Sequence, residues 1–274
     1  MRKVFEDLGD DSQFVAVYFD NIYVSTSSWE EHLRIMRLVL ERLKLHGLTA
    51  RPSKCRIGYP EVKYLGFTLG NGSVSPSLDK VSAISDMKPP STKKQLRSFL
   101  GLVGFYRKFV PHFSEMSAPL TGLLRKDSKE PLSWSPEHER CFESLKGKLV
   151  ESPILALPDL SKTFCLRTDA SNKALGAVLF QYVNSVPQPV SYASRKLLDR
   201  EVNYATVEKE CLAIVWAIDK FKYYLFGREF ILETDHRPLQ YLQSSRGKNS
   251  RLTRWSLALQ TYKFNVSHVP GPWG

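Results

Sequence analysis

Two aspartates at the ends of matching short segments are the residues best placed to do chemistry in this sequence. Residues 164–171 read F-C-L-R-T-D-A-S and residues 230–237 read F-I-L-E-T-D-H-R, so the pattern F-x-L-x-T-D occurs twice, 66 positions apart, and ends on Asp169 and Asp235. Alternate residues of a strand face opposite sides of a sheet, so each aspartate faces away from the Phe, Leu and Thr of its copy. If the two strands are parallel neighbours, the carboxylates meet at one end of a sheet, where they repel each other unless a cation joins them.

A third carboxylate is predicted on a helix between the two copies. Apolar residues recur at helical spacing from Val207 to Leu225, which predicts a continuous buried stripe. Glu210 falls on this stripe near the first turn, whereas Glu208 lies off it and is expected to be solvated. Because an unpaired buried carboxylate is costly, Glu210 requires a partner, and a cation shared with the two aspartates would supply one.

Three acidic side chains gathered at one edge of a sheet are typical of a site for Mg²⁺ or Mn²⁺, which prefer oxygen ligands. Two such ions roughly 4 Å apart can activate a water molecule and stabilise the leaving oxygen in phosphodiester cleavage. Unrelated surface acids at strand ends are the alternative, which the matched copies and the helical glutamate disfavour. Two histidines, His236 and His268, could shuttle protons here, although a structural role is the favoured interpretation of both.

The charge of the chain points to a polyanionic partner. The formal net charge is +11, from 39 basic and 28 acidic side chains, and such a balance favours binding to phosphate backbones. Basic and aromatic residues alternate in one helical stretch, and a second stretch, from Ser244 to Trp255, contains no acid. The nucleic-acid-binding candidates are Arg97, Arg107, Lys108, Arg246, Lys248, Arg251 and Arg254. Ordinary solvated side chains are the alternative for both stretches.

The elements that must position these residues differ between the two halves of the chain. In the first half, β-rich runs at 14–18 and 22–25 predict a hairpin with Asp20 and Asn21 at its tip. A capping box at Ser28 and Glu31 then predicts a helix. Its expected apolar stripe comprises Leu33, Met36, Leu40 and Leu43. The runs 62–69 and 72–74 are expected to form a second hairpin around a turn at 70–72.

Short helices are expected at 79–87, from residue 92 onward and at 114–124, followed by a connector with a helix from Pro136 to about Val150 that buries Cys141, Leu145 and Leu149. In the last part, strands are expected at 163–169, 175–182, 188–193, 229–235 and 263–269, with helices at 206–225, 237–243 and 251–260. Three consecutive strands, a helix, and then a strand parallel to the first predict a mixed five-stranded α/β sheet.

Cysteine usage and hydropathy indicate an intracellular protein of the cytoplasm or nucleus. The four cysteines include no C-x-x-C pair, which disfavours a zinc knuckle, and Cys165 and Cys211 are expected to be buried thiols. No apolar run approaches the length of a membrane span, and the N-terminus lacks the apolar region of a signal peptide. We therefore expect no membrane partner.

Several long motifs resemble a known family. T-D-A-S at 168–171, Y-A-T-V-E-K-E-C-L-A-I-V-W-A at 204–217 and L-E-T-D-H-R-P-L at 232–239 are similar to the ribonuclease H domain of Gypsy-type LTR retrotransposon Pol polyproteins. Y-L-G-F at 64–67 and the stretch at 93–113 resemble the palm end and thumb of the adjoining reverse transcriptase. The resemblance implies a partial palm at 1–75, a helical thumb at 76–127, a connector at 128–160 and a ribonuclease H-like domain at 161–274.

The same resemblance implies an activity. Asp169, Glu210 and Asp235 occupy the positions of three of the family's four metal-binding carboxylates. The implied enzyme is a two-metal endonuclease, a hydrolase that cleaves the RNA strand of RNA–DNA hybrids and leaves a 3′-hydroxyl and a 5′-phosphate.

Three departures from the family pattern qualify this expectation. Asn21 stands where the polymerase motif has a second aspartate, so Asp20 and Asn21 are interpreted as a vestige of that motif. The upstream palm strand with its own aspartate is missing before Met1, so polymerase activity is expected to be lost. The segment with the fourth carboxylate is missing after residue 274, which is expected to weaken the second metal. A homodimer, or a polymerase portion supplied in trans, would complete the first site.

Two other interpretations stay open at this point. A non-catalytic module, as a relic or a domesticated gene, would keep the basic thumb and the hybrid-binding groove and would bind nucleic acid without cleaving it. A relic that never folds stably would expose the apolar edge of an incomplete sheet.

Overall fold

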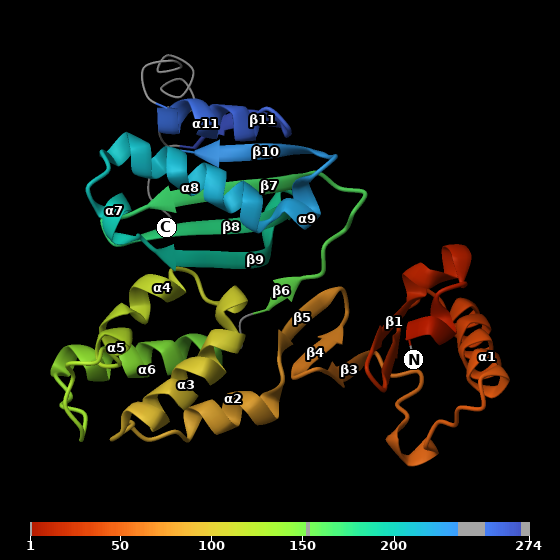
Figure 1. Cartoon of the computed structure of the whole chain (residues 1–274). Coiled ribbons are helices and arrows are strands. Elements are labelled where there is room, and N and C mark those ends of the chain that lie inside the picture. Colours follow the sequence, from red (N-terminus) through yellow and green to blue (C-terminus); the bar gives the residue numbers. More distant parts are fainter. Residues whose placement is uncertain (1, 152–153, 235–249, 270–274) are drawn as a thin grey trace. The chain divides into compact units, whose positions relative to one another are not determined.

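The described residues form both helices and strands, with a run of helices between residues 78 and 150, as the mixed patterning predicts (Figure 1). The computed structural model describes residues 2–151, 154–234 and 250–269. The strands are β1 (Val15–Tyr18), β2 (Asn21–Val24), β3 (Glu61–Tyr64), β4 (Phe67–Gly70), β5 (Ser73–Pro76), β6 (Leu155–Ala156), β7 (Phe164–Ala170), β8 (Ala174–Val183), β9 (Val186–Lys196), β10 (Glu229–Thr234) and β11 (Lys263–His268).

The helices are α1 (Trp29–Leu45), α2 (Leu78–Ser85), α3 (Lys93–Phe105), α4 (Phe113–Met116), α5 (Ala118–Gly122), α6 (Pro136–Val150), α7 (Asp199–Val202), α8 (Thr206–Lys220), α9 (Lys222–Leu225) and α11 (Ser250–Leu259). Short 3₁₀ helices are η1 (Arg2–Phe5), η2 (Gly9–Phe14), η3 (Pro52–Lys54) and η4 (Arg107–Phe109). Backbone contacts group the elements into two units, residues 1–71 and 72–274. Among the described residues, no helix is long and apolar enough to cross a membrane.

The first unit contains the predicted hairpin and the predicted capped helix. Strands β1 and β2 pair antiparallel with Tyr18 opposite Asn21, and the Ser28 side chain caps α1 by accepting a hydrogen bond from the Glu31 amide. The predicted stripe of α1 is wrong in part, because Leu33 and Leu40 are exposed.

The buried face of α1 comprises Ile35, Val39 and Leu43, which pack with Val4, Phe5 and Leu8 of the N-terminal segment. A second departure lies in the run 62–69, which is not a single strand. Leu65 and Gly66 have φ of 51° and 83° and form a turn that makes β3 and β4 an antiparallel hairpin.

The second unit is built around a five-stranded sheet with the order β11-β10-β7-β8-β9. Strands β7, β8 and β9 form an antiparallel meander, and β10 lies parallel to both β7 and β11. This confirms the predicted mixed sheet. The expected long helix at 206–225 is interrupted at Phe221, which separates α8 from α9.

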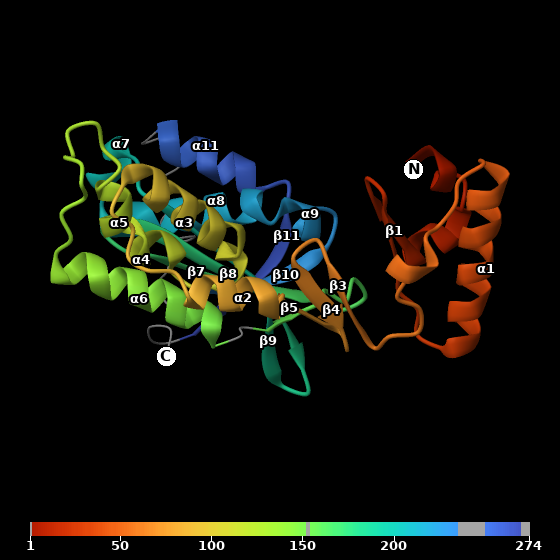
Figure 2. The same ribbon diagram turned by 90° about the horizontal axis from the view of Figure 1, so that it is seen from below.

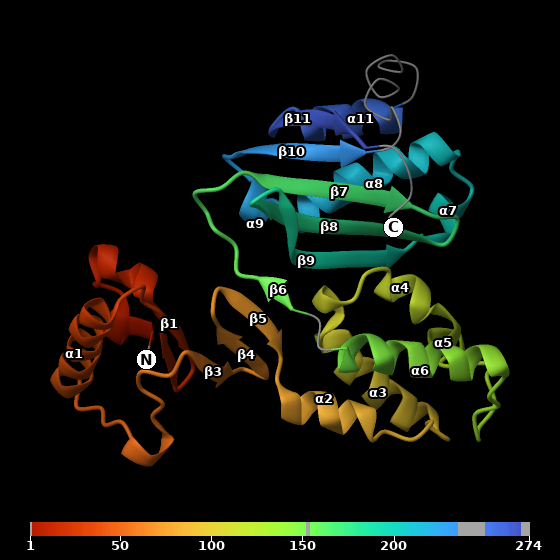
Figure 3. The same cartoon turned by 180° about the vertical axis from the view of Figure 1, so that it is seen from behind.

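The two faces of this sheet are covered differently. Helix α8 lies against one face, where Phe164, Leu166 and Leu179 pack with Cys211 and other residues of the predicted stripe (Figure 1). The opposite face, seen in Figure 3, carries a smaller buried cluster of Cys165, Val178 and Phe180. Buried Cys165 and Cys211 confirm the expectation for these two thiols.

The helices between residues 78 and 150 pack on one another, and α4 packs on β9 (Figure 2). Thr92 and Gln95 form a capping box at the start of α3, as expected from the position of Thr92. Helix α6 has the predicted bounds, but Phe142 takes the buried position that was expected for Cys141.

Polar contacts join α4 and α5 to the sheet. The Ser114 amide donates a hydrogen bond of 2.8 Å to the buried Ser194 hydroxyl of β9, and the Lys196 ammonium donates to the Ala118 carbonyl at 3.3 Å and to the Thr121 hydroxyl.

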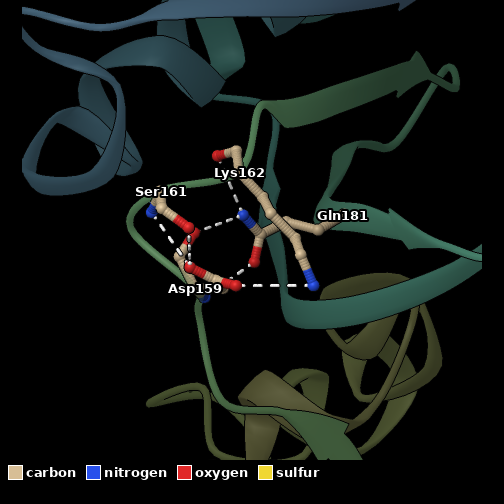
Figure 4. A network of polar contacts seen from close by, with 4 residues as sticks. All are labelled: Asp159, Ser161, Lys162 and Gln181. Carbon is tan, nitrogen blue, oxygen red and sulfur yellow. Dashed lines mark hydrogen bonds and ion pairs between the residues drawn. The ribbon is translucent and has the colours of Figure 1, made fainter.

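The segment that enters β7 is fixed by one buried amide (Figure 4). The Gln181 side chain of β8 accepts a hydrogen bond from the Asp159 amide at 2.9 Å and donates to the carbonyls of Asp159 and Lys162 at 2.7 and 3.1 Å. Ser161 donates to the Asp159 carboxylate from both its amide and its hydroxyl. The start of the strand that carries Asp169 is therefore anchored to its neighbour.

Candidate active site

Asp169 lies at the C-terminal end of β7, as the F-x-L-x-T-D pattern predicts. It is half-buried and pairs with Gly176 of β8, and the preceding Thr168 is buried. A tight turn follows, in which the Ser171 hydroxyl accepts hydrogen bonds from the amides of Lys173 and Ala174. The turn sets the point at which the chain leaves the sheet just beyond the carboxylate.

The two copies of the motif are parallel neighbours. Strands β7 and β10 pair Phe164 with Phe230 and Leu166 with Leu232, an offset of 66 positions that equals the sequence separation of the two copies. Asp235 and His236 lie outside the described residues. The register of the two strands is confirmed, and the position of the second carboxylate stays a prediction.

Glu210 is 3% exposed in the first turns of α8, which confirms that it faces away from water. The adjacent Lys209 reaches the segment after β7, where its ammonium donates a hydrogen bond of 3.0 Å to the Asn172 side chain. Asn172 follows Asp169 by three residues, so the first turns of α8 are tied to the end of β7. Burial, followed by the charge of Glu210, raises the pKa of the Cys211 thiol to about 12.

Glu208 is not solvated, contrary to expectation. Its carboxylate accepts a hydrogen bond of 2.6 Å from Arg251 of α11 and another from the Ala205 amide. It therefore stabilises the start of α8 and is fully engaged there.

The described donors fit a hard cation in kind, because Asp169 and Glu210 offer only oxygen and lie on elements that pack together. Within residues 2–151, 154–234 and 250–269, no group of three His, Cys, Asp or Glu side chains could hold a metal ion. The third predicted ligand, Asp235, is outside these ranges, so the complete ligand set stays a prediction. His268 lies exposed in β11, opposite Thr234.

The basic candidates of the helical stretch occupy different surroundings. Arg97 is exposed on α3. Arg107 donates a hydrogen bond to the Ser194 carbonyl of β9, and its guanidinium lies 5.8 Å from the centre of the Phe113 ring. Lys108 is half-buried 5.1 Å from the centre of the Phe109 ring, and burial lowers its pKa. Arg107 thus joins the helices to the sheet.

A second group of basic candidates lines a cleft of about 520 Å³ between α7, α8 and α11. Its walls include Arg200, Arg251, Arg254, Tyr204 and Trp255. Arg251 stacks 3.8 Å from the centre of the Tyr204 ring, whereas the Arg254 side chain is exposed. Arg246 and Lys248 lie outside the described residues. Arg200 was not among the candidates from the sequence. Because it stands next to the acidic Glu201, its local sequence does not indicate a basic surface.

The other predicted site is the tip of the β1–β2 hairpin in the first unit. Phe19 and Asp20 form the turn, and Asn21 begins β2. The Asn21 amide donates a long hydrogen bond of 3.4 Å to the Asp20 carboxylate on the exposed surface. The hairpin tip therefore offers a single carboxylate.

Sequence reasoning also missed an ion pair beside the motif. Arg167 and Glu233 are register partners in β7 and β10, and the Arg167 guanidinium donates two hydrogen bonds, of 2.9 and 2.5 Å, to one Glu233 oxygen. The Tyr182 hydroxyl donates to the other oxygen at 3.0 Å. The sequence contained a signal for this ion pair, because Arg167 and Glu233 occupy the same position in the two copies of the motif and so face each other when the copies pair in register.

Two family models match the chain. The model described as "RNase H-like domain found in reverse transcriptase" matches residues 159–262, and the model described as "Reverse transcriptase (RNA-dependent DNA polymerase)" matches residues 1–69. These ranges contain the carboxylate site and the hairpin, respectively.

Similar proteins are much longer than this chain. The Retrovirus-related Pol polyprotein from transposon 297 of Drosophila melanogaster is 40% identical over 93% of this chain and 24% of that protein. The Transposon Tf2-7 polyprotein of Schizosaccharomyces pombe is 36% identical over 94% of this chain and 20% of that protein. The chain thus spans less than a quarter of the length of these relatives.

Solved structures show the same fold. A foamy viral protease-reverse transcriptase in complex with an RNA/DNA hybrid matches 98% of this chain and 36% of that chain, with a TM-score of 0.82 and 25% identity. A second structure of a foamy viral protease-reverse transcriptase, in complex with double-stranded DNA, is 24% identical. It matches 100% of this chain and 48% of that chain with a TM-score of 0.86.

Proposed function

This chain belongs to the Pol polyproteins of LTR retrotransposons, with a reverse-transcriptase segment and an RNase H-like segment, and we propose that it cleaves the RNA strand of RNA–DNA hybrids with the help of divalent metal ions. The observation that carries the proposal is the parallel register of β7 and β10, which pairs the residues that precede T-D in the two copies. The RNA/DNA hybrid bound by the similar foamy viral protein supports the choice of substrate.

The proposed ligands are Asp169, Glu210 and Asp235. Asp169 lies near the C-terminal end of β7, and Lys209, the neighbour of Glu210, donates a hydrogen bond to Asn172 just after that strand, which supports the grouping of Asp169 with Glu210. Bound Mg²⁺ or Mn²⁺ would supply Lewis-acid stabilisation of the phosphodiester and a nucleophilic water. The carboxylates would orient the ions, and the burial of Glu210 would exclude bulk water from one side of the site.

The backbone of the hybrid would be held by the basic cleft. Arg251 and Arg254 with Arg200 line a hollow beside the first turn of α8, where guanidinium groups can form paired hydrogen bonds to phosphate oxygens. Arg97 offers an exposed charge on α3. Binding of this kind should weaken as salt concentration rises.

The test is cleavage of a labelled RNA–DNA hybrid by the full chain in Mg²⁺ or Mn²⁺. We expect Asp169→Asn and Glu210→Gln each to reduce the rate at least about 100-fold, because even residues that merely orient metal ligands contribute 10–100-fold. The matched control is Asp219→Asn, which makes the same change on the exposed far end of α8 and should leave the rate unchanged.

Cleavage at equal rates by the wild type and Asp169→Asn would indicate a contaminating nuclease and refute the assignment. Salt-sensitive binding of the hybrid without cleavage would identify a non-catalytic binding module instead.

We propose no polymerase activity for the first unit alone. Its hairpin offers the Asp20 carboxylate, and the neutral Asn21 amide cannot add negative charge to a magnesium site. The proposed substrate also implies an intracellular location, where RNA–DNA hybrids are formed.

A further inference from the structure

The two copies of the motif differ at the position before T-D, where one has Arg167 and the other has Glu233. The structure places these residues directly opposite each other in β7 and β10. Glu233 is 4% exposed, and its two oxygens accept hydrogen bonds from Arg167 and Tyr182. The three side chains form a polar group on the face of the sheet opposite α8, the face shown in Figure 3.

Arg167 lies on the same face of β7 as Asp169, two residues away, a distance of about 6.6 Å along the strand. A guanidinium on a long side chain can span this distance and bind a carboxylate through two hydrogen bonds. An Arg167 side chain turned toward Asp169 would therefore compete with a metal ion for the same oxygens.

The contacts of the Arg167 guanidinium lie beside Arg167 and toward the start of β7. The guanidinium lies 5.5 Å from the centre of the Phe180 ring, and Phe180 pairs with Cys165, two residues before Arg167. Tyr182, which donates to Glu233, is two residues further in that direction along β8. On the Asp169 side, the register partner is Gly176, which has no side chain of its own to hold a guanidinium and lies next to the His112 imidazole.

We propose that Glu233, with Phe180 and Tyr182, is a positioning residue that holds the Arg167 guanidinium away from Asp169 and so keeps that carboxylate open to a divalent cation. The inference rests on the proposed function for the identity of the metal ligand. It assigns a role to the one position at which the two copies of the motif carry opposite charges.

The experiment is calorimetric titration of Mn²⁺ into the full chain without nucleic acid. We expect Glu233→Gln to raise the Mn²⁺ dissociation constant about tenfold or more, because it releases Arg167 toward Asp169. The double variant Arg167→Gln/Glu233→Gln removes the competing cation and should return the dissociation constant to the wild-type range. A purely structural pair predicts the opposite order, with the double variant no better than Glu233→Gln.

A measurement without metal separates this inference from the proposed function. In arginine-labelled protein, Asp169→Asn should shift the NMR signal of the Arg167 Nε–H group in the Glu233→Gln background and leave it unchanged in the wild-type background. If Asp169→Asn leaves the Arg167 Nε–H signal unshifted in both backgrounds, the inference is overturned. If the wild type binds no Mn²⁺, the proposed function fails, and the NMR result alone decides the role of Glu233.

Discussion

Replacing Gln181 by Met should destabilise the second unit by removing three hydrogen bonds at the entry to β7. Gln181 is 3% exposed, and its amide group bonds the backbone of Asp159 twice and that of Lys162 once. Methionine has a similar length and flexible shape, so it fills the same space without a hydrogen-bonding group. The change therefore isolates the polar contribution from the packing contribution.

The expected loss follows from the number of bonds. Each intramolecular hydrogen bond contributes about 1 kcal/mol net, so three give about 3 kcal/mol of unfolding free energy. For a unit of 150–250 residues, each kcal/mol changes the Tm by about 2–4 °C, so the Tm should fall by about 6–12 °C.

The assay is thermal unfolding followed by circular dichroism, with Gln188→Met as the matched control. Gln188 is the register partner of Gln181 on β9, and no side-chain hydrogen bond of it occurs in the described part of the chain. A Tm that falls equally in the two variants, or by less than about 2 °C in Gln181→Met, would refute the reasoning.

Two further predictions concern titratable groups. Burial raises the pKa of Glu201, but hydrogen bonds from Arg195 and the Leu198 amide outweigh it and leave the pKa below its usual value. A glutamate whose pKa is lowered in the folded state stabilises the fold at a pH above its unfolded-state pKa of about 4.3, and this stabilisation is lost as the pH falls through the folded-state pKa. The Tm of the wild type should therefore drop more than the Tm of Glu201→Gln between about pH 6 and pH 3. Burial raises the pKa of Cys165 to about 11 and that of Cys211 to about 12, so a thiol reagent at about pH 8 should modify the exposed Cys55 first and the buried pair only on unfolding. Equal rates at all three thiols, measured by mass spectrometry, would contradict this.

The sheet was predictable because its signals are local. The period-2 pattern of each T-D copy sets the strand and the face of its residues, and the helical spacing around Glu210 requires burial. Both outcomes follow from neighbours along the chain. The parallel pairing of β7 and β10 also followed, because a meander and a helix intervene between them.

The sequence predictions were wrong or incomplete where contacts between segments distant in the chain determine which residues are buried or paired. In α1, Ile35 and Val39 are buried because the N-terminal segment packs on them, and the spacing of Leu33 and Leu40 fits a helical stripe equally well. Arg107 contacts β9, 87 residues further along the chain, so its local basic and aromatic surroundings could not predict its partner. Glu208 likewise owes its pairing to Arg251 of α11.

The hydrogen bonds between β9 and the helices α4 and α5 matter for any attempt to express the five-stranded sheet as a separate fragment. A fragment beginning at residue 159, where one family match starts, would strip Ser194 of the Ser114 amide and leave Lys196 without the Ala118 carbonyl. The Ser194 side chain, which is 2% exposed in the longer chain, would then face solvent. A fragment meant to retain these contacts must therefore include α4 and α5, which a boundary at residue 159 would remove.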